Sequence, residues 1–140
     1  HPGLTPGHSM PEATVQLLAE AASLPPDVAL RKFVENALGD DPPEGVADEI
    51  YRKRVENPLD PAGWQAQAAA GTTFAGVDGD ITQPTLLVTG TADRVIDHRN
   101  SDVLQGLIPG SKLVKLDGLG HLFFWEQTDS VVRIVSEFLV

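Results

Sequence analysis

The sequence predicts an α/β fold, in which a mostly helical first part is followed by a βαβα unit with two parallel strands. Two short apolar runs, residues 86–88 and 113–116, are typical of strands buried on both faces of a parallel sheet. A helical pattern at residues 99–107, closed by Pro109 and Gly110, separates the two runs. Ahead of them lie four short segments with helical apolar spacing, joined by proline-rich turns.

The expected helices are delimited by local signals. The first four cover residues 11–23, 25–38, 45–56 and 60–70, and a last amphipathic helix covers residues 129–139. Prolines stand in the first turns of the first two helices, where a missing N–H costs nothing. We expect Gly39 to end the second helix, Asp60 to cap the fourth and Thr128 to cap the last.

The length, hydrophobic content and net charge of the chain limit the functions that it can have. The 140 residues are 41% hydrophobic, enough for one domain with a modest core. The net charge is −10, from 20 acidic and 10 basic residues. Nucleic acids and anionic membrane surfaces require clustered lysine and arginine, so we expect neither as a partner. No apolar run approaches the roughly 20 residues of a membrane span, and the first residues do not resemble a signal peptide, so we expect a cytoplasmic protein.

An acid and a histidine follow the two predicted strands. Asp93 comes after the first strand, and His121 comes after the second, within a glycine-rich loop. The carboxyl ends of parallel strands form the edge where open α/β sheets bind their ligands. Asp93 could accept the hydrogen of one imidazole nitrogen and leave the other as a base for a nucleophile. Alternatively, Asp93 forms a turn and His121 binds local backbone groups.

Residues 81–140 resemble the carboxyl-terminal core of the α/β-hydrolase family. The segments that carry the resemblance are PTLLVTGTADRVID at residues 84–97, KLVKLDGLGHLFFWEQ at residues 112–127, and the last helix. In that family the acid follows the seventh strand and the histidine the eighth. The resemblance implies that Asp93 is the catalytic acid and His121 the general base. It also implies that residues 1–80 are a leading loop and a helical cap, with residues 74–81 returning to the core.

The nucleophile is the missing part of this predicted triad. Gly7, His8 and Ser9 begin a near match to the G-x-S-x-G elbow, but Pro11 replaces its final glycine. The proline- and glycine-rich residues before Ser9 cannot form the central strand that an elbow requires. We therefore expect the nucleophile to lie outside this chain, together with the first six strands, and the chain alone to be inactive.

The functional expectation is hydrolysis of an ester, lactone or related bond in a small molecule, without a cofactor or metal. Phe123, Phe124 and Trp125 could line an apolar substrate site or belong to the core, and Glu126 is expected to introduce the last helix. An unpaired strand edge should be covered by the amino-terminal half of the core, by self-association or by a rearranged fold. The alternatives are a non-catalytic binding protein on the same scaffold and an unrelated small α/β module.

Overall fold

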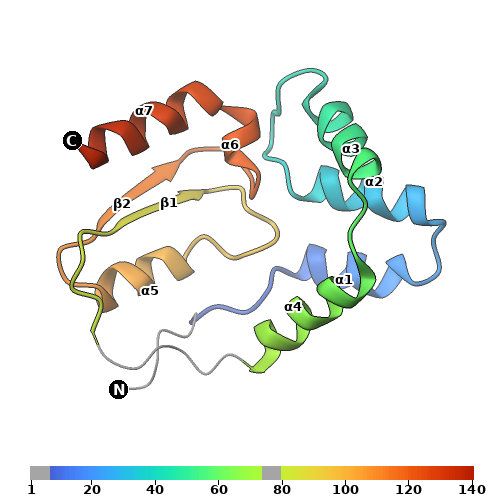
Figure 1. Cartoon of the computed structure of the whole chain (residues 1–140), viewed down its shortest axis with the longest axis horizontal. Helices are drawn as coiled ribbons and strands as arrows, with labels where there is room; N and C mark the ends of the chain where they lie inside the picture. The colour runs from blue at the N-terminus through green and yellow to red at the C-terminus, as the bar shows by residue number, and fades with distance from the viewer. Residues whose placement is uncertain (1–6, 74–79) are drawn as a thin grey trace.

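The computed structural model describes residues 7–73 and 80–140. Figure 1 shows a helical part on one side and a two-stranded sheet on the other, with α5 and α7 on opposite faces of the sheet. The elements, in chain order, are α1 (Glu12–Ala21), α2 (Pro26–Asn36), α3 (Val46–Glu56), α4 (Pro61–Thr73), β1 (Leu86–Gly90), α5 (Asn100–Leu107), β2 (Lys112–Leu116), α6 (Phe123–Glu126) and α7 (Thr128–Leu139). The predicted helical region followed by a βαβα unit is confirmed.

The helix starts follow the local signals in the sequence. Pro11 and Pro25 immediately precede α1 and α2, as expected for helices that begin at a proline-rich turn. The Asp60 carboxylate accepts the backbone N–H of Gly63 at 2.8 Å, so Asp60 caps α4. Most of the predicted return segment, residues 74–81, lies outside the described residues.

Two predicted helix ends were wrong. Thr128 is the first residue of α7 rather than its cap, and its hydroxyl donates to the carbonyl of Phe124 at 2.8 Å. Gly39 does not end α2, which stops at Asn36. The glycine is required because a Cβ atom on Gly39 would lie 2.2 Å from the carbonyl oxygen of Gly118. Its role is therefore the close approach of two loops, not helix termination.

The sheet consists of two parallel strands in the described part of the chain. The register runs from Leu86 opposite Lys112 to Gly90 opposite Leu116, so both strands end at the same edge. Residues 86–88 are only half-buried, in contrast to the predicted burial on both faces. The reason is the width of the sheet, because two strands and two helices cannot enclose these side chains as a wider sheet would.

The best-buried apolar cluster lies between α2, α3 and the segment around α6. Its buried members are Val34, Leu38, Val46 and Ile50, and the half-buried Leu30, Ala47, Leu122 and Trp125 pack against it. Because residues 122 and 125 come from the segment that follows His121, this cluster attaches the helical part to the end of the sheet. No helix in the described ranges is long and apolar enough to cross a membrane.

Candidate active site

The loops that follow β1 and β2 are bonded to each other at the carboxyl edge of the sheet. The backbone N–H of Thr91 donates to the carbonyl of Leu116, and that of Ala92 to the carbonyl of Leu119, both at 2.9 Å. A Cβ atom on Gly90 would lie 2.1 Å from the carbonyl oxygen of Leu119, so only glycine permits this contact. The two loops are therefore held together immediately before Asp93 and His121.

Asp93 and His121 form a hydrogen-bonded pair. Asp93 Oδ2 lies 2.9 Å from His121 Nδ1, and Oδ1 accepts the backbone N–H groups of Val95 and Ile96 at 2.8 and 2.9 Å. The aspartate side chain is 7% exposed and the histidine side chain 41% exposed. Nε2 of His121 has no hydrogen-bond partner among the described residues. The acid is thus fixed behind the ring, and the opposite ring nitrogen stays open.

The histidine loop is anchored by the buried carboxylate of Glu126. Its Oε1 accepts the backbone N–H of Gly120 at 2.8 Å, and its Oε2 accepts that of Gly39 at 2.9 Å. Glu126 is 6% exposed. It closes the short helix α6, so the prediction that it introduces the last helix missed its main contacts. Glu126 ties the residue before His121 to the loop that follows α2.

The loop of Asp93 is anchored to the helical part. The Arg94 guanidinium donates to the carbonyl of Leu38 at 3.2 Å and to the carboxylate of Asp40 at 2.7 Å. The buried hydroxyl of Thr14 donates to the carbonyl of Arg94 and accepts the side-chain amide of Asn36 at 2.7 Å. Helix α1 is thereby bonded directly to Arg94, the residue that follows Asp93, and α2 is linked to Arg94 through Thr14 and through the loop that follows α2.

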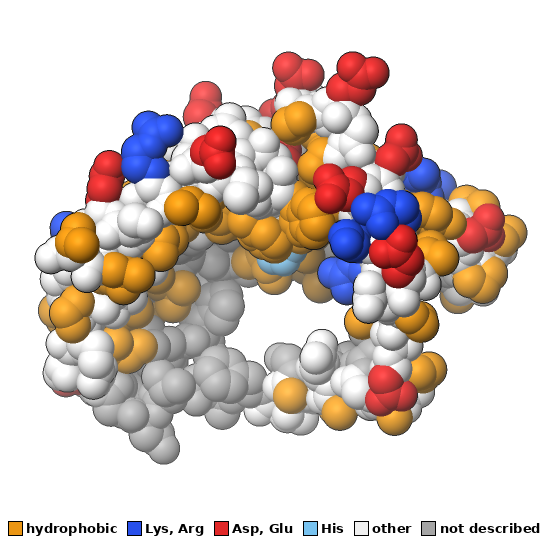
Figure 2. Space-filling model, turned by 45° about the horizontal axis from the view of Figure 1, so that its top comes forward, with side chains coloured by type: hydrophobic (Ala, Val, Ile, Leu, Met, Phe, Trp, Pro, Cys, Tyr) orange, Lys and Arg blue, Asp and Glu red, His pale blue; other side chains and the backbone are white. Residues whose placement is uncertain are grey.

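His121 borders an apolar cavity of about 460 Å³ beneath the first three helices. The lining residues are Leu18, Leu30, Phe33, Val34, Ala37, Ile50, Arg54, Leu59, Val95, His121 and Leu122. Figure 2 shows hydrophobic side chains gathered around the hollowed face of the molecule. A mostly apolar cavity of this size with few polar groups is the usual form of a small-molecule site. His121 and Arg54 are the two lining residues with polar side chains.

The three aromatic residues after His121 do not belong to the lining of this cavity. Phe124 is 46% exposed, and its ring meets that of Phe123 edge-on with centroids 5.6 Å apart. Trp125 packs against the apolar cluster of α2 and α3. The residue next to His121 that does line the cavity is Leu122.

Ser9 lies on an exposed stretch of irregular backbone. No strand precedes it within the described residues 7–10, so this part of the chain does not form the strand, turn and helix of a nucleophile elbow. The neighbouring His8 is fixed through its backbone, because its N–H donates to the side chain of Asn100 at 2.7 Å and its carbonyl accepts from it at 3.1 Å.

A second acidic residue of the Asp93 loop, Asp97, is paired with an arginine. The Arg99 guanidinium binds the carboxylate of Asp97, with Nε 2.9 Å from Oδ1. This side-chain hydrogen bond holds the pKa of Asp97 well below its ordinary value. Asp97 therefore stays paired with Arg99 at neutral pH, while Asp93 is the carboxylate that contacts His121.

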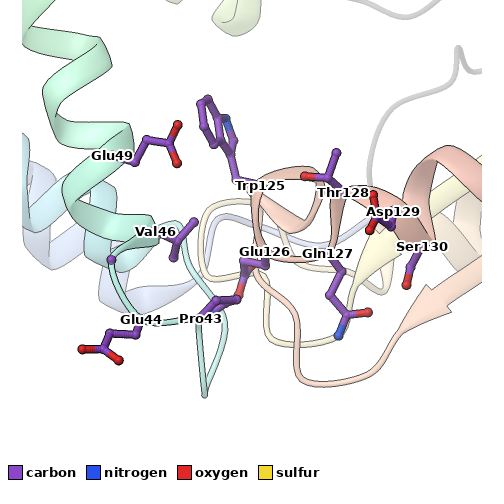
Figure 3. A pocket seen from close by; sticks show the side chains of 11 residues that line it. Pro43, Glu44, Val46, Glu49, Trp125, Glu126, Gln127, Thr128, Asp129 and Ser130 are labelled. Carbon is purple, nitrogen blue, oxygen red and sulfur yellow. The ribbon is translucent and has the colours of Figure 1, made fainter.

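A second cavity, of about 570 Å³, opens between the start of α3 and the turn from α6 to α7 (Figure 3). Its charged lining residues are all acidic: Glu44, Glu49, Glu126 and Asp129. Neither Asp93 nor His121 lines it. Within the part of the chain that the structure describes, no group of three or more acidic, histidine or cysteine side chains could hold a metal ion.

Comparison with known proteins identifies the family. The protein-family model described as alpha/beta hydrolase fold matches residues 15–128, which is most of the chain. This chain belongs to the α/β-hydrolase fold family. Among proteins of described function, the poly(3-hydroxyalkanoate) depolymerase of Ectopseudomonas oleovorans is 36% identical over 76 residues, which make up 54% of this chain and 26% of the depolymerase.

Solved structures show the same fold. A 2-hydroxy-6-oxo-6-phenylhexa-2,4-dienoate hydrolase from Rhodococcus sp. superposes over 97% of this chain and 52% of its own, with a TM-score of 0.74 and 24% identity. An esterase from Exiguobacterium antarcticum superposes over 92% of this chain and 48% of its own, with a TM-score of 0.72 and 23% identity. The chain thus spans about half the length of these hydrolases.

Proposed function

We propose that this chain supplies the acid and the general base of an α/β-hydrolase that cleaves an ester, lactone or related bond. The contact between Asp93 Oδ2 and His121 Nδ1 at 2.9 Å carries the proposal, because a carboxylate behind Nδ1 leaves Nε2 to accept a proton. His121 would take the proton of the nucleophile and give it to the leaving alkoxide, then take a proton from the attacking water and return it to the nucleophile. One water molecule thereby splits the ester bond into an acid and an alcohol.

The nucleophile and the oxyanion donors of this mechanism would come from the other half of the fold. The proposal is supported by the irregular backbone around Ser9 and by a chain length of about half that of the hydrolases with the same fold. Within the described residues, one edge of β1 has no strand partner. We propose that strands of the other half pair with this edge, and that the assembled enzyme acts in the cytoplasm.

The experiment compares the purified 140-residue chain with the complete hydrolase, using a chromogenic short-chain ester as substrate. Turnover is expected only when the nucleophile-bearing half is present, as a continuous chain or as a second fragment that binds the first. Turnover by the 140-residue chain alone that disappears in Ser9→Ala would show that Ser9 is the nucleophile and would refute the proposal.

A non-catalytic binding protein on the same scaffold is the competing function. It predicts that the complete protein binds small apolar molecules in the cavity without turning over any ester. The acid and histidine contact favours the enzyme, since a scaffold used only for binding has no chemical need for an oriented histidine facing its cavity.

A further inference from the structure

The cavity at His121 has a second polar group, whose role the hydrolytic chemistry leaves unexplained. Of the eleven lining residues, nine have apolar side chains, and the two exceptions are His121 and Arg54. Arg54 is on α3, one turn after Ile50, which also lines the cavity. Arg54 is an exposed residue, so its guanidinium is accessible to an anion that enters the cavity from solvent.

Arg54 has no acidic partner among the described residues. None of the residues three or four positions before or after Arg54 is acidic; they are Tyr51, Ile50, Asn57 and Pro58. Two other arginines of the helical part do have acidic partners: Arg52 on α3 pairs with Glu56 at 2.7 Å, and Arg31 on α2 pairs with Asp48 at 2.6 Å. In a chain with a net charge of −10, an unpaired arginine beside an apolar cavity is available to an anion.

We propose that Arg54 binds a carboxylate of the substrate, and that the cavity takes molecules in which an apolar segment separates this carboxylate from the bond to be cleaved. The guanidinium would hold the carboxylate through paired hydrogen bonds, and the aliphatic side chains of α1, α2 and α3 would enclose the apolar segment. The bond to be cleaved would then lie at His121. The catalytic part of this inference rests on the proposed function, whereas the binding part does not.

Binding of octanoate and of 1-octanol to the 140-residue chain tests the inference. The two probes have the same alkyl length and differ in charge, so the ratio of their dissociation constants isolates the contribution of the anion contact. Arg54→Gln is expected to weaken octanoate binding by at least about tenfold and to leave 1-octanol binding unchanged. The matched control is Arg52→Gln on the same helix, which removes an equal charge outside the cavity and should leave both affinities unchanged.

Three results would overturn the inference. The first is a wild-type chain that fails to bind octanoate or binds it no better than 1-octanol. The second is an equal loss of both probes in Arg54→Gln, which would make Arg54 part of the cavity shape rather than an anion site. The third is an equal loss of octanoate in Arg54→Gln and Arg52→Gln, which would indicate general charge attraction. Because none of these measurements involves turnover, failure of the proposed hydrolase function would leave the binding result standing.

Discussion

Asp93 Oδ2 lies 2.9 Å from His121 Nδ1 at the carboxyl edge of the two parallel strands. With a carboxylate at Nδ1, the neutral imidazole carries its hydrogen on that nitrogen and exposes a lone pair on Nε2. The second carboxylate oxygen is held by two backbone N–H groups, so the aspartate has little freedom to turn away.

Glu126→Gln should destabilise the histidine loop. A glutamine has one acceptor oxygen, so its amide would face the N–H of either Gly39 or Gly120 and leave that buried donor unsatisfied. We expect the free energy of unfolding to fall by about 1–3 kcal/mol in urea denaturation. The imidazole resonances of His121 should also shift in NMR spectra. The control is Glu137→Gln on exposed α7, and equal stabilities for the two variants would contradict the role of Glu126.

Gly120→Ala should displace the same loop by steric overlap. The new Cβ atom would lie 2.3 Å from the carbonyl carbon of Leu38, so backbone on one side has to move. We expect a loss of about 2 kcal/mol or more in thermal or denaturant unfolding. Gly106→Ala in α5 is the matched control, because its Cβ meets open space and alanine is the better helix former by about 0.5–1 kcal/mol. Opposite signs of the two changes are the predicted result, and two changes of the same sign would refute the packing argument.

Thr14→Val should loosen the helical part from the Asp93 loop. Valine keeps the shape of threonine but removes the hydroxyl that joins Asn36 to the carbonyl of Arg94. Two polar groups then lose their partner, for which we expect a cost of about 1–3 kcal/mol in the free energy of unfolding. Thr82→Val, at an exposed position, should stay within about 0.5 kcal/mol of the wild type. A Thr14→Val variant as stable as that control would show that the contact contributes nothing.

Local features of the structure were predictable from the sequence, because they depend on signals within a few residues. Asp60 caps a helix as its position before Pro61 suggested, and the two apolar runs form strands in parallel register. The positions of Asp93 and His121 after those strands were enough to predict that the two side chains could meet. Burial of residues 86–88 was not predictable, because it depends on how many strands flank them.

The anchors of the site could not be predicted, since each joins residues far apart in the chain. Glu126 binds a backbone N–H group 87 residues away, and Thr14 binds the carbonyl of a residue 80 positions later. The same holds for Arg54, whose place on the cavity depends on the packing of α3 over the histidine loop. The sequence shows Glu126 six residues after Gly120, but no local pattern indicates which backbone N–H groups its carboxylate will bind.

The most direct test of the central claim is ester turnover by the complete hydrolase in three variants. His121→Ala and Asp93→Asn should each lower kcat by about 10³-fold or more, because one removes the base and the other its oriented hydrogen bond. Asp97→Asn, in the same loop but paired with Arg99, should stay close to the wild type. Full activity in a folded His121→Ala or Asp93→Asn variant would contradict the assignment of acid and base to this pair.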